Sequence, residues 1–345
     1  MKYLSDEPAT KDSLGRDEIV TSFKQCVESC KTPFAIGLCG TWGTGKTTLM
    51  KLVKKELDDN NSTDPKILTI WFDTWQYQTT EDIEIALLYK TYKTFITKLK
   101  DSSIRSKVDE LFIKTVNAFL ALASGLKFSL GPSGLGFEVE TKKIPNESEK
   151  VIEKNSSLEK IQAPYLARDN FEEFIEKIKK SLNVDKLVFF IDDLDRCSSR
   201  NAVKVLEYLK NYLNIDGCVY VLGLDKKTIK RHIEKENVSM SEEIEFLDKI
   251  IQLEFQIPII DRKKLSKFVQ SIYEENFSSE CEEFLLVGLG ENPRYIKRFI
   301  NTLALTYNLV ADDSINNNLR ETIEKKFRKI EEKDFKKKPR KNFKK

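Results

Sequence analysis

FAIGLCGTWGTGKTTLM, at residues 34–50, sets the frame for the whole chain. Its first six residues, apolar apart from one glycine, predict a buried parallel strand. The next eight, GTWGTGKT at 40–47, fit the pattern G-x-x-x-x-G-K-[ST] in full, and a helical sequence follows. Glycines let backbone N–H groups turn inward, and the start of the helix directs its positive dipole end at the same point. The stretch therefore predicts a cradle for phosphate groups.

The side chains of this loop have separate expected roles toward a nucleotide. The ammonium of Lys46 reaches the β- and γ-phosphates, and the hydroxyl of Thr47 ligates Mg²⁺. The residues expected to contact the nucleotide are Gly40, Thr41, Trp42, Gly43, Thr44, Gly45, Lys46, Thr47 and Thr48. The alternative is a glycine-rich turn with a chance lysine, and the order of strand, turn and helix argues against it.

A second acidic motif follows the apolar run at 187–191, which ends in Asp192 and Asp193. The carboxyl end of a buried parallel strand faces the ligand edge of its sheet. We expect Asp192 to hold Mg²⁺ and Asp193 to orient or deprotonate an attacking water. Asp195 is equally well explained as a helix N-cap. Many hydrolysing proteins of this architecture carry Glu in place of Asp193, so a protein that binds ATP without hydrolysing it stays an alternative.

The order of predicted elements indicates the fold class. Buried strands are expected at 34–39, 67–72, 187–191, 219–224 and 253–257, and helical patterns lie between them. Strands that alternate with helices give an α/β fold with a parallel sheet and a three-layer sandwich. The pattern at 263–309 is helical only and predicts a separate C-terminal lid.

These patterns divide the chain into five expected segments. They are the first part of the core at 1–100, an insertion or linker at 101–165, the second part of the core at 166–260, the helical lid at 261–312 and a charged basic tail at 313–345. Within the insertion, residues 131–164 are rich in Gly, Pro, Asn and Ser and are expected to be irregular.

An apolar piece at 118–125 raises the question of a membrane span. Only 12 residues without charge lie between Lys114 and Lys127, and a span needs roughly 20. We therefore expect a buried or interfacial helix and no membrane attachment.

Composition points to a globular chain with an uneven charge distribution. Of the 345 residues, 40% are hydrophobic and 33% charged, and the net charge is +3. Residues 321–345 hold twelve Lys or Arg against five Asp or Glu, so the tail carries +7 and the remainder −4. Such a tail either contacts nucleic acid through its phosphates or is a solvated, disordered end.

The cysteines and the N-terminus bear on the cellular setting. The six cysteines and single histidine show neither zinc-ligand spacing nor a disulfide framework. Cys26 and Cys30 are expected in the core of a helix, and His232 as an exposed or capping residue. Residues 1–10 are polar and acidic, unlike a signal peptide. Together these features predict a cytoplasmic protein.

Several blocks in order carry a family resemblance. They are GTWGTGKT at 40–47, WFDTWQY at 71–77, FIDDLDRC at 190–197, YVLGLD at 220–225, FLDKIIQL at 246–253 and NPRYIKRFIN at 292–301. In this set the sequence resembles the KAP family of P-loop NTPases, a group within the ATPase class that includes AAA+ and STAND proteins. The resemblance covers roughly residues 10 to 305.

The resemblance implies ATP as the nucleotide and a helical lid. It implies that Arg294 approaches the γ-phosphate as a sensor, and that Arg196 acts as an arginine finger toward a neighbouring subunit. Arg16, in the sequence LGR at 14–16, resembles the adenine-side motif of related ATPases. Arg294 has an ordinary alternative, a pair with a carboxylate. Of the aromatic residues after the second strand, Trp71 is expected in the core.

The combined interpretation is a Mg²⁺-dependent ATPase that acts as a conformational switch, with partner proteins or as a homo-oligomer. Family members often carry inserted membrane helices, which this chain lacks at 111–165, and bacterial members are often linked to defence against phage. The alternatives are a nucleic-acid-associated ATPase that uses residues 321–345, and a non-hydrolysing scaffold gated by ATP. GTP is disfavoured because the chain has no N-K-x-D motif.

Overall fold

The computed structural model describes residues 3–9, 11–59, 65–78, 82–124, 129–130, 137–138, 149–211, 214–236, 246–272, 288, 290 and 292–311. The described residues form two compact units. One lies within Pro8–Ile259, and the other combines residues of Met1–Glu7 with residues of Ile260–Lys345. The expected basic tail lies outside the described residues.

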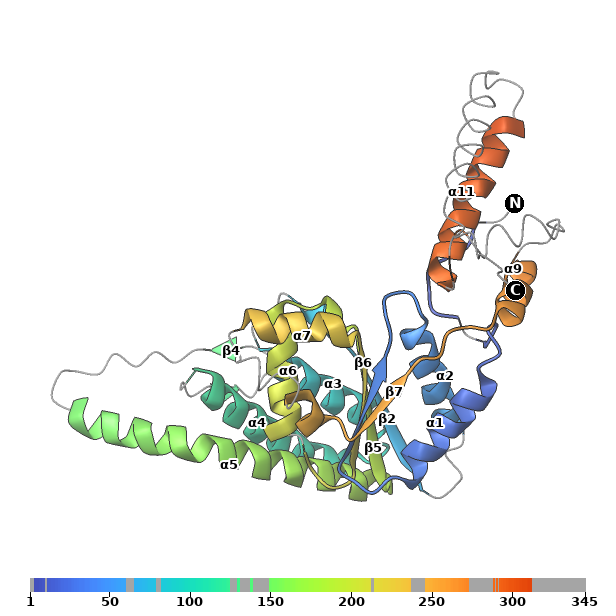
Figure 1. Cartoon of the computed structure of the whole chain (residues 1–345). Coiled ribbons are helices and arrows are strands. Elements are labelled where there is room, and N and C mark those ends of the chain that lie inside the picture. Colours follow the sequence, from blue (N-terminus) through green and yellow to red (C-terminus); the bar gives the residue numbers. More distant parts are fainter. Residues whose placement is uncertain are drawn as a thin grey trace, which may run out of the picture. The chain divides into compact units, whose positions relative to one another are not determined.

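A five-stranded parallel sheet forms the centre of the larger unit (Figure 1). Its strands are β1 (Phe34–Cys39), β2 (Ile67–Asp73), β5 (Lys186–Asp192), β6 (Cys218–Leu224) and β7 (Leu253–Gln256). Their order across the sheet is β2-β5-β6-β1-β7. All five lie at the expected apolar runs, which confirms the α/β class and the parallel sheet. Strand β6 lies between β1 and β5. The glycine-rich loop after β1 and the acidic motif after β5 therefore lie at the same edge of the sheet, with one strand between them.

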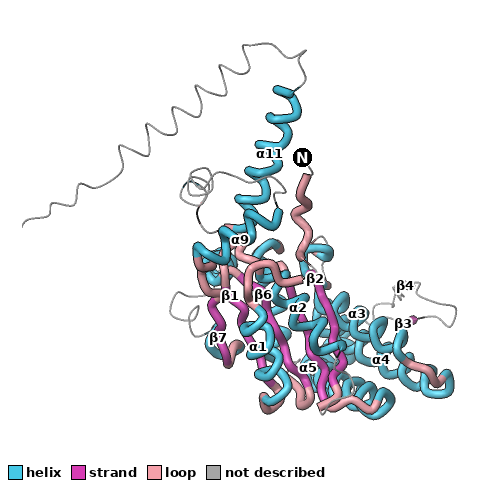
Figure 2. Tube along the Cα trace, turned by 90° about the vertical axis from the view of Figure 1, so that its right-hand side faces the viewer, coloured by secondary structure: helices cyan, strands magenta, loops and turns pink. Residues whose placement is uncertain are grey.

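Helices cover both faces of this sheet (Figures 1 and 2). On one face pack α1 (Asp17–Ser29) and α2 (Lys46–Asp59). On the other pack α3 (Ile83–Lys98), α4 (Ser102–Ser124), α5 (Glu149–Leu182), α6 (Ser199–Asn211) and α7 (Lys226–Lys235). Alternate strand residues face opposite layers: Val188 and Phe190 contact the first, and Phe189 and Ile191 the second. Burial on both faces explains why the strands are apolar throughout.

The insertion between β2 and β5 is more helical than its composition predicts. Helix α5 begins at Glu149, so the expectation of irregular chain is wrong for residues 149–164. Glu and Lys in this stretch are good helix formers and outweigh the Asn and Ser at 155–157. A short hairpin, β3 (Ser129–Leu130) and β4 (Phe137–Glu138), belongs to the same insertion. The other residues of 131–148 lie outside the described ones.

The apolar piece at 118–125 falls largely in α4, as expected for a buried helix. Phe119 is fully buried and meets Phe171 of α5 edge-on, with ring centroids 6.4 Å apart. Across the described ranges, no helix combines the length and the apolarity that a membrane crossing requires.

The smaller unit contains the helices α9 (Arg262–Ile272) and α11 (Pro293–Ala311). Residues 4–6 run along α11. The Leu4 N–H donates to Asn301 Oδ1 at 2.6 Å, and Lys297 Nζ donates to the Ser5 carbonyl at 3.2 Å. The helical character expected after residue 263 is confirmed for the described part, while a lid function stays a prediction.

Candidate nucleotide site

The glycine-rich loop joins β1 to α2, and its glycines have steric reasons to be there. Gly43 and Gly45 have φ angles of 86° and 93°, in the region that side chains disfavour. A Cβ on Gly40 would lie 2.6 Å from the hydroxyl of Thr44. The loop is therefore closely folded on itself, which leaves the backbone free to face a ligand.

Lys46 begins α2 and points back across the loop. Its ammonium donates to the Gly40 carbonyl at 2.8 Å and to the Thr41 carbonyl at 3.4 Å, and it lies 3.8 Å from Asp195 Oδ2. Both charged side chains are more than nine-tenths buried. The ammonium thus lies at the inner side of the loop, where a bound phosphate group would be within reach of a charge-assisted hydrogen bond.

Asp192 ends β5 and faces the start of α2. Its side chain forms a hydrogen bond with Thr47, which opposes the rise in pKa that burial imposes on this carboxyl. Its Oδ1 is buried and has no hydrogen-bond partner among the described residues. A Cβ on Gly223 of β6 would lie 2.7 Å from that oxygen and 2.8 Å from Met50 Sδ. Gly223 thus provides the space that the carboxylate occupies.

The Thr47 hydroxyl and the Asp192 carboxylate fit a Mg²⁺ ion. Both supply the hard oxygen ligands that this ion prefers, and the free Oδ1 has a lone pair to give. The described part of the chain has no cluster of three or more His, Cys, Asp or Glu suited to a metal. The remaining ligands would therefore come from nucleotide phosphates and water, the usual arrangement for Mg²⁺.

Asp193 lies just beyond the strand in an unusual backbone conformation. Its φ is 56° and ψ 28°, the left-handed region that non-glycine residues rarely adopt. Burial and the adjacent charge of Asp192 raise the pKa of Asp193 to about 7, while Arg196 opposes the shift. Arg196 NH2 lies 2.9 Å from Asp193 Oδ1. A carboxyl poised near neutral pH matches the requirement for a general base.

The segment after β2 packs against this acidic loop. Two short 3₁₀ helices meet here, η1 (Thr74–Tyr77) and η2 (Leu194–Arg196). The buried Thr74 hydroxyl donates to the Asp192 carbonyl at 2.7 Å. Trp75 is 48% exposed, and its ring centre lies 5.9 Å from the guanidinium carbon of Arg196. Trp71, expected in the core, is half-buried: it stacks on Phe190 and packs against the core from its edge.

Three further residues join the site without having been predicted there. Asp195 lies beside Lys46, which a role as a helix cap does not account for. His232 is no free surface residue, because its Nδ1 lies 2.8 Å from Ser199 Oγ and its Nε2 3.3 Å from the Asp195 carbonyl. It thereby ties α7 to the acidic loop. The third is Gly223, whose only sequence signal is its position in a strand adjacent to β5.

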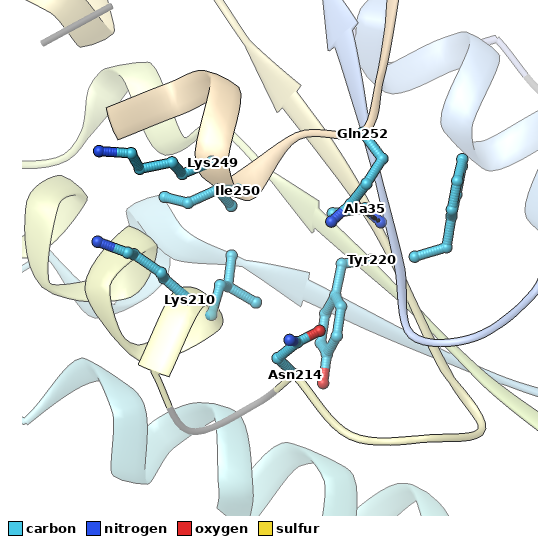
Figure 3. Close-up of a pocket in the computed structure, with 9 residues that line it drawn as sticks. Ala35, Lys210, Asn214, Tyr220, Lys249, Ile250 and Gln252 are labelled. Atoms are coloured by element: carbon cyan, nitrogen blue, oxygen red, sulfur yellow. Dashed lines mark hydrogen bonds between the residues drawn. The ribbon is translucent and has the colours of Figure 1, made fainter. Parts of the chain in front are cut away.

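One small cavity lies apart from the candidate site, and none of the described cysteines is in a disulfide. A cavity of about 30 Å³ beside Ala35, Tyr220 and Gln252 (Figure 3) lies near the start of β1, the end opposite to the loop. It has room for little more than a water molecule. The cysteines of the described chain, five of the six, are free thiols, and burial raises the pKa of Cys39 to about 12. Cys281 lies outside the described residues.

A model of the KAP family P-loop domain matches residues 16–310. The chain belongs to the KAP family. The match spans the loop, the acidic motif and most of α11, and with the parallel sheet it assigns this chain a P-loop NTPase domain. No match was found among curated proteins.

Two solved structures resemble this KAP chain at low similarity. The ORC2 protein of Aeropyrum pernix in ADPNP–ADP complexes is 12% identical, with 94% of this chain and 70% of that chain covered and a TM-score of 0.41. The ORC1 protein of the same organism, in complex with DNA, is 12% identical, with 94% and 68% covered and a TM-score of 0.42.

The arginines that the KAP resemblance singles out have defined surroundings. Arg16 is buried, and its NH1 donates to the Thr44 carbonyl at 2.9 Å, so it supports the loop from within the larger unit. Arg294 belongs to the smaller unit, where its Nε donates to Asp6 Oδ2 at 2.9 Å. Arg298 binds the same carboxylate at 3.0 Å. The pair with a carboxylate is thus present, and the sensor role of Arg294 stays a prediction.

Proposed function

We propose that this KAP domain binds ATP with Mg²⁺, hydrolyses it, and uses the cycle as a conformational switch. The observation that carries the proposal is the juxtaposition of Lys46, Thr47 and Asp192 at one edge of the sheet, with Asp193 next to them. The glycine-rich loop supplies the phosphate cradle that this set of side chains surrounds.

The proposed division of labour follows from the geometry. Lys46 leaves the Gly40 carbonyl and donates to phosphate oxygens. Thr47 and Asp192 would hold Mg²⁺, which would supply electrostatic stabilisation of charge on those oxygens. Asp193 accepts a proton from the attacking water, which its pKa of about 7 suits at neutral pH. Arg16 holds the loop at Thr44 and contributes positive charge behind it.

The switch part of the proposal concerns the smaller unit. Arg294 would contact the γ-phosphate. Loss of that contact after hydrolysis would change the relation between the two units. This follows the KAP resemblance, as does a role in defence against phage or in a multi-protein system. The alternatives, a nucleic-acid-associated ATPase and a non-hydrolysing scaffold, differ from it in measurable ways.

The first test is equilibrium ATP binding with and without Mg²⁺. We expect Lys46→Ala to weaken ATP binding at least about 100-fold, because charged contacts to phosphate are worth about 1.5–3 kcal/mol each and the loop acts as a unit. Thr47→Ala should remove the effect of Mg²⁺ on affinity while weak metal-free binding persists. Lys55→Ala, an exposed lysine on the same helix, is the matched control.

The outcomes separate the alternatives. Binding unchanged in Lys46→Ala would contradict the proposed site. ATP binding that depends on Lys46, without turnover at any Mg²⁺ concentration, would favour the gated scaffold. Turnover that rises severalfold with DNA, and loses that rise when residues 321–345 are removed, would favour the nucleic-acid-associated ATPase.

A further inference from the structure

We propose that Arg196 is a positioning residue for Asp193 of its own chain, and that the ring of Trp75 supports the Arg196 guanidinium through a cation–π contact. The inference rests on the proposed function, since it assigns Arg196 to the hydrolytic step. It replaces the arginine finger toward a neighbouring subunit by a contact within one acidic loop.

The first observation is the contact itself. Arg196 NH2 lies 2.9 Å from Asp193 Oδ1, with the two side chains 30% and 12% exposed. Asp193 has left-handed backbone angles, so its carboxylate direction is not set by regular structure. A carboxylate at the end of a strained turn needs a neighbouring group to hold its direction, and Arg196, three residues on, supplies it.

The second observation is the support under Arg196. The Trp75 ring lies 5.9 Å from the guanidinium carbon, within the range of a cation–π contact. The backbone N–H of Trp75 donates to Asp73 Oδ1 at 3.1 Å, and the Thr74 hydroxyl donates to the Asp192 carbonyl. The turn that carries the ring is therefore fastened to the end of β2, which leads into it, and to the end of β5, which leads into the acidic loop.

The third observation is the direction of the guanidinium. Its Nε is buried and has no hydrogen-bond partner among the described residues, and a terminal nitrogen faces Asp193. An arginine finger extends outward to another subunit's nucleotide, and this guanidinium is instead turned inward. The aromatic residue that follows β2 thereby gains a role that the sequence block alone did not indicate.

Turnover and affinity measured side by side test the role. Arg196→Met keeps the apolar stem but removes the charge, and we expect kcat to fall about 10- to 100-fold while the Kd for ATP stays within about twofold. Arg196→Lys should recover part of kcat, because one N–O contact can be remade. Arg200→Ala, an exposed arginine on α6, is the matched control and should match wild type. A loss of ATP affinity equal to the loss of kcat would overturn the role.

Two substitutions of Trp75 test whether its ring supports the Arg196 guanidinium. Trp75→Phe keeps a ring and should retain most of kcat, whereas Trp75→Leu should lose several-fold more. Equal turnover in the two variants would contradict the support of Arg196 by the Trp75 ring.

Mixing variants separates a contact within one chain from a finger in trans. Arg196→Met has an intact loop, and Lys46→Ala has an intact Arg196. If Arg196 served a neighbour, a mixture of the two would regain turnover, so regained turnover would overturn the proposal. We expect the turnover of the mixture to equal that of Arg196→Met alone, because Lys46→Ala adds no active sites.

A double-mutant cycle of Asp193→Asn and Arg196→Met on the unfolding equilibrium needs no hydrolysis. We expect the two substitutions to be coupled by a factor of about 2 to 150 in the unfolding constant. Additive effects would overturn the contact. If wild type turns over no ATP, the proposed function fails at hydrolysis, and this cycle still decides whether Arg196 holds Asp193.

Discussion

The ammonium of Lys46 lies 3.8 Å from the carboxylate of Asp195, with both groups almost removed from solvent. This pair brings a third acidic residue of the motif at 192–195 to the lysine of the loop. An incoming polyphosphate meets the Asp195 charge at close range, and like charges at such distances repel even at an effective dielectric near 20.

Asp195→Asn should therefore tighten ATP binding, by about 3- to 10-fold. The substitution removes the competing partner of Lys46 and the repulsion of phosphate together. Titration of ATP into the variant and wild type by calorimetry measures the change. Weaker binding would mean that Asp195 instead holds Lys46 in place for the phosphates.

Gly223→Ala should displace the Asp192 carboxylate. The added Cβ would lie 2.7 Å from Asp192 Oδ1 and 2.8 Å from Met50 Sδ, so one of them must move. We expect a loss of about 1–3 kcal/mol in unfolding free energy and a weakened dependence of ATP affinity on Mg²⁺. Gly288→Ala has open space around its Cβ and serves as control. An unchanged dependence of ATP affinity on Mg²⁺ would contradict the role of Asp192 as a Mg²⁺ ligand.

The raised pKa of Asp193 gives a pH signature in the nucleotide-free protein. A carboxyl whose pKa is about 7 in the folded protein and 3.8 in the unfolded chain stabilises the fold while protonated, and this stability is lost as pH rises between those values. Asp193→Asn stays neutral, so it should match wild type near pH 4 and exceed it by about 1–2 kcal/mol at pH 8, a figure reduced for partial solvent screening.

Urea unfolding in EDTA at several pH values measures the Asp193 effect. Asp59→Asn, an exposed position at the end of α2, is the control and should show no such trend. An advantage for Asp193→Asn that shrinks as pH rises would contradict the assigned shift.

The contact of Asp6 with α11 should have the opposite dependence on pH. Burial opposes the ionised form, but hydrogen bonds from Arg294 and Arg298 outweigh it and lower the pKa of Asp6. The contact is then present at neutral pH and is lost as pH falls below 3.8, the pKa of an ordinary aspartate. Asp6→Asn should speed hydrogen exchange in residues 3–7 at pH 7 by a few-fold, as expected for an exposed pair. Glu7→Gln is the control. Equal hydrogen exchange in the two variants would contradict an ionic contribution of Asp6 to the contact with α11.

The sequence predicted the parts of this protein that depend on local pattern. The five strands, the loop at 40–47 and the ends of β5 at Asp192 and Asp193 follow from apolar runs and glycine spacing, and the structure has them there. The insertion was predicted less well, because the helix formers at 149–164 are polar and lack a clear apolar period.

The remaining site features depend on which strands become neighbours. Gly223 reaches Asp192 only because β6 pairs with β5, and Thr74 reaches it because Asp73 and Asp192 are partners in register. His232 contacts the acidic loop through the packing of α7. No local pattern encodes such pairings, so these residues could be assigned only from the fold.

ATP turnover by wild type beside Asp193→Asn, at saturating ATP and Mg²⁺, tests the central claim most directly. General-base catalysis contributes about 10²- to 10⁴-fold, so we predict that kcat falls by at least about 100-fold while the Kd for ATP is unchanged. Equal turnover in the two proteins would contradict the account of Asp193 as the base at this site.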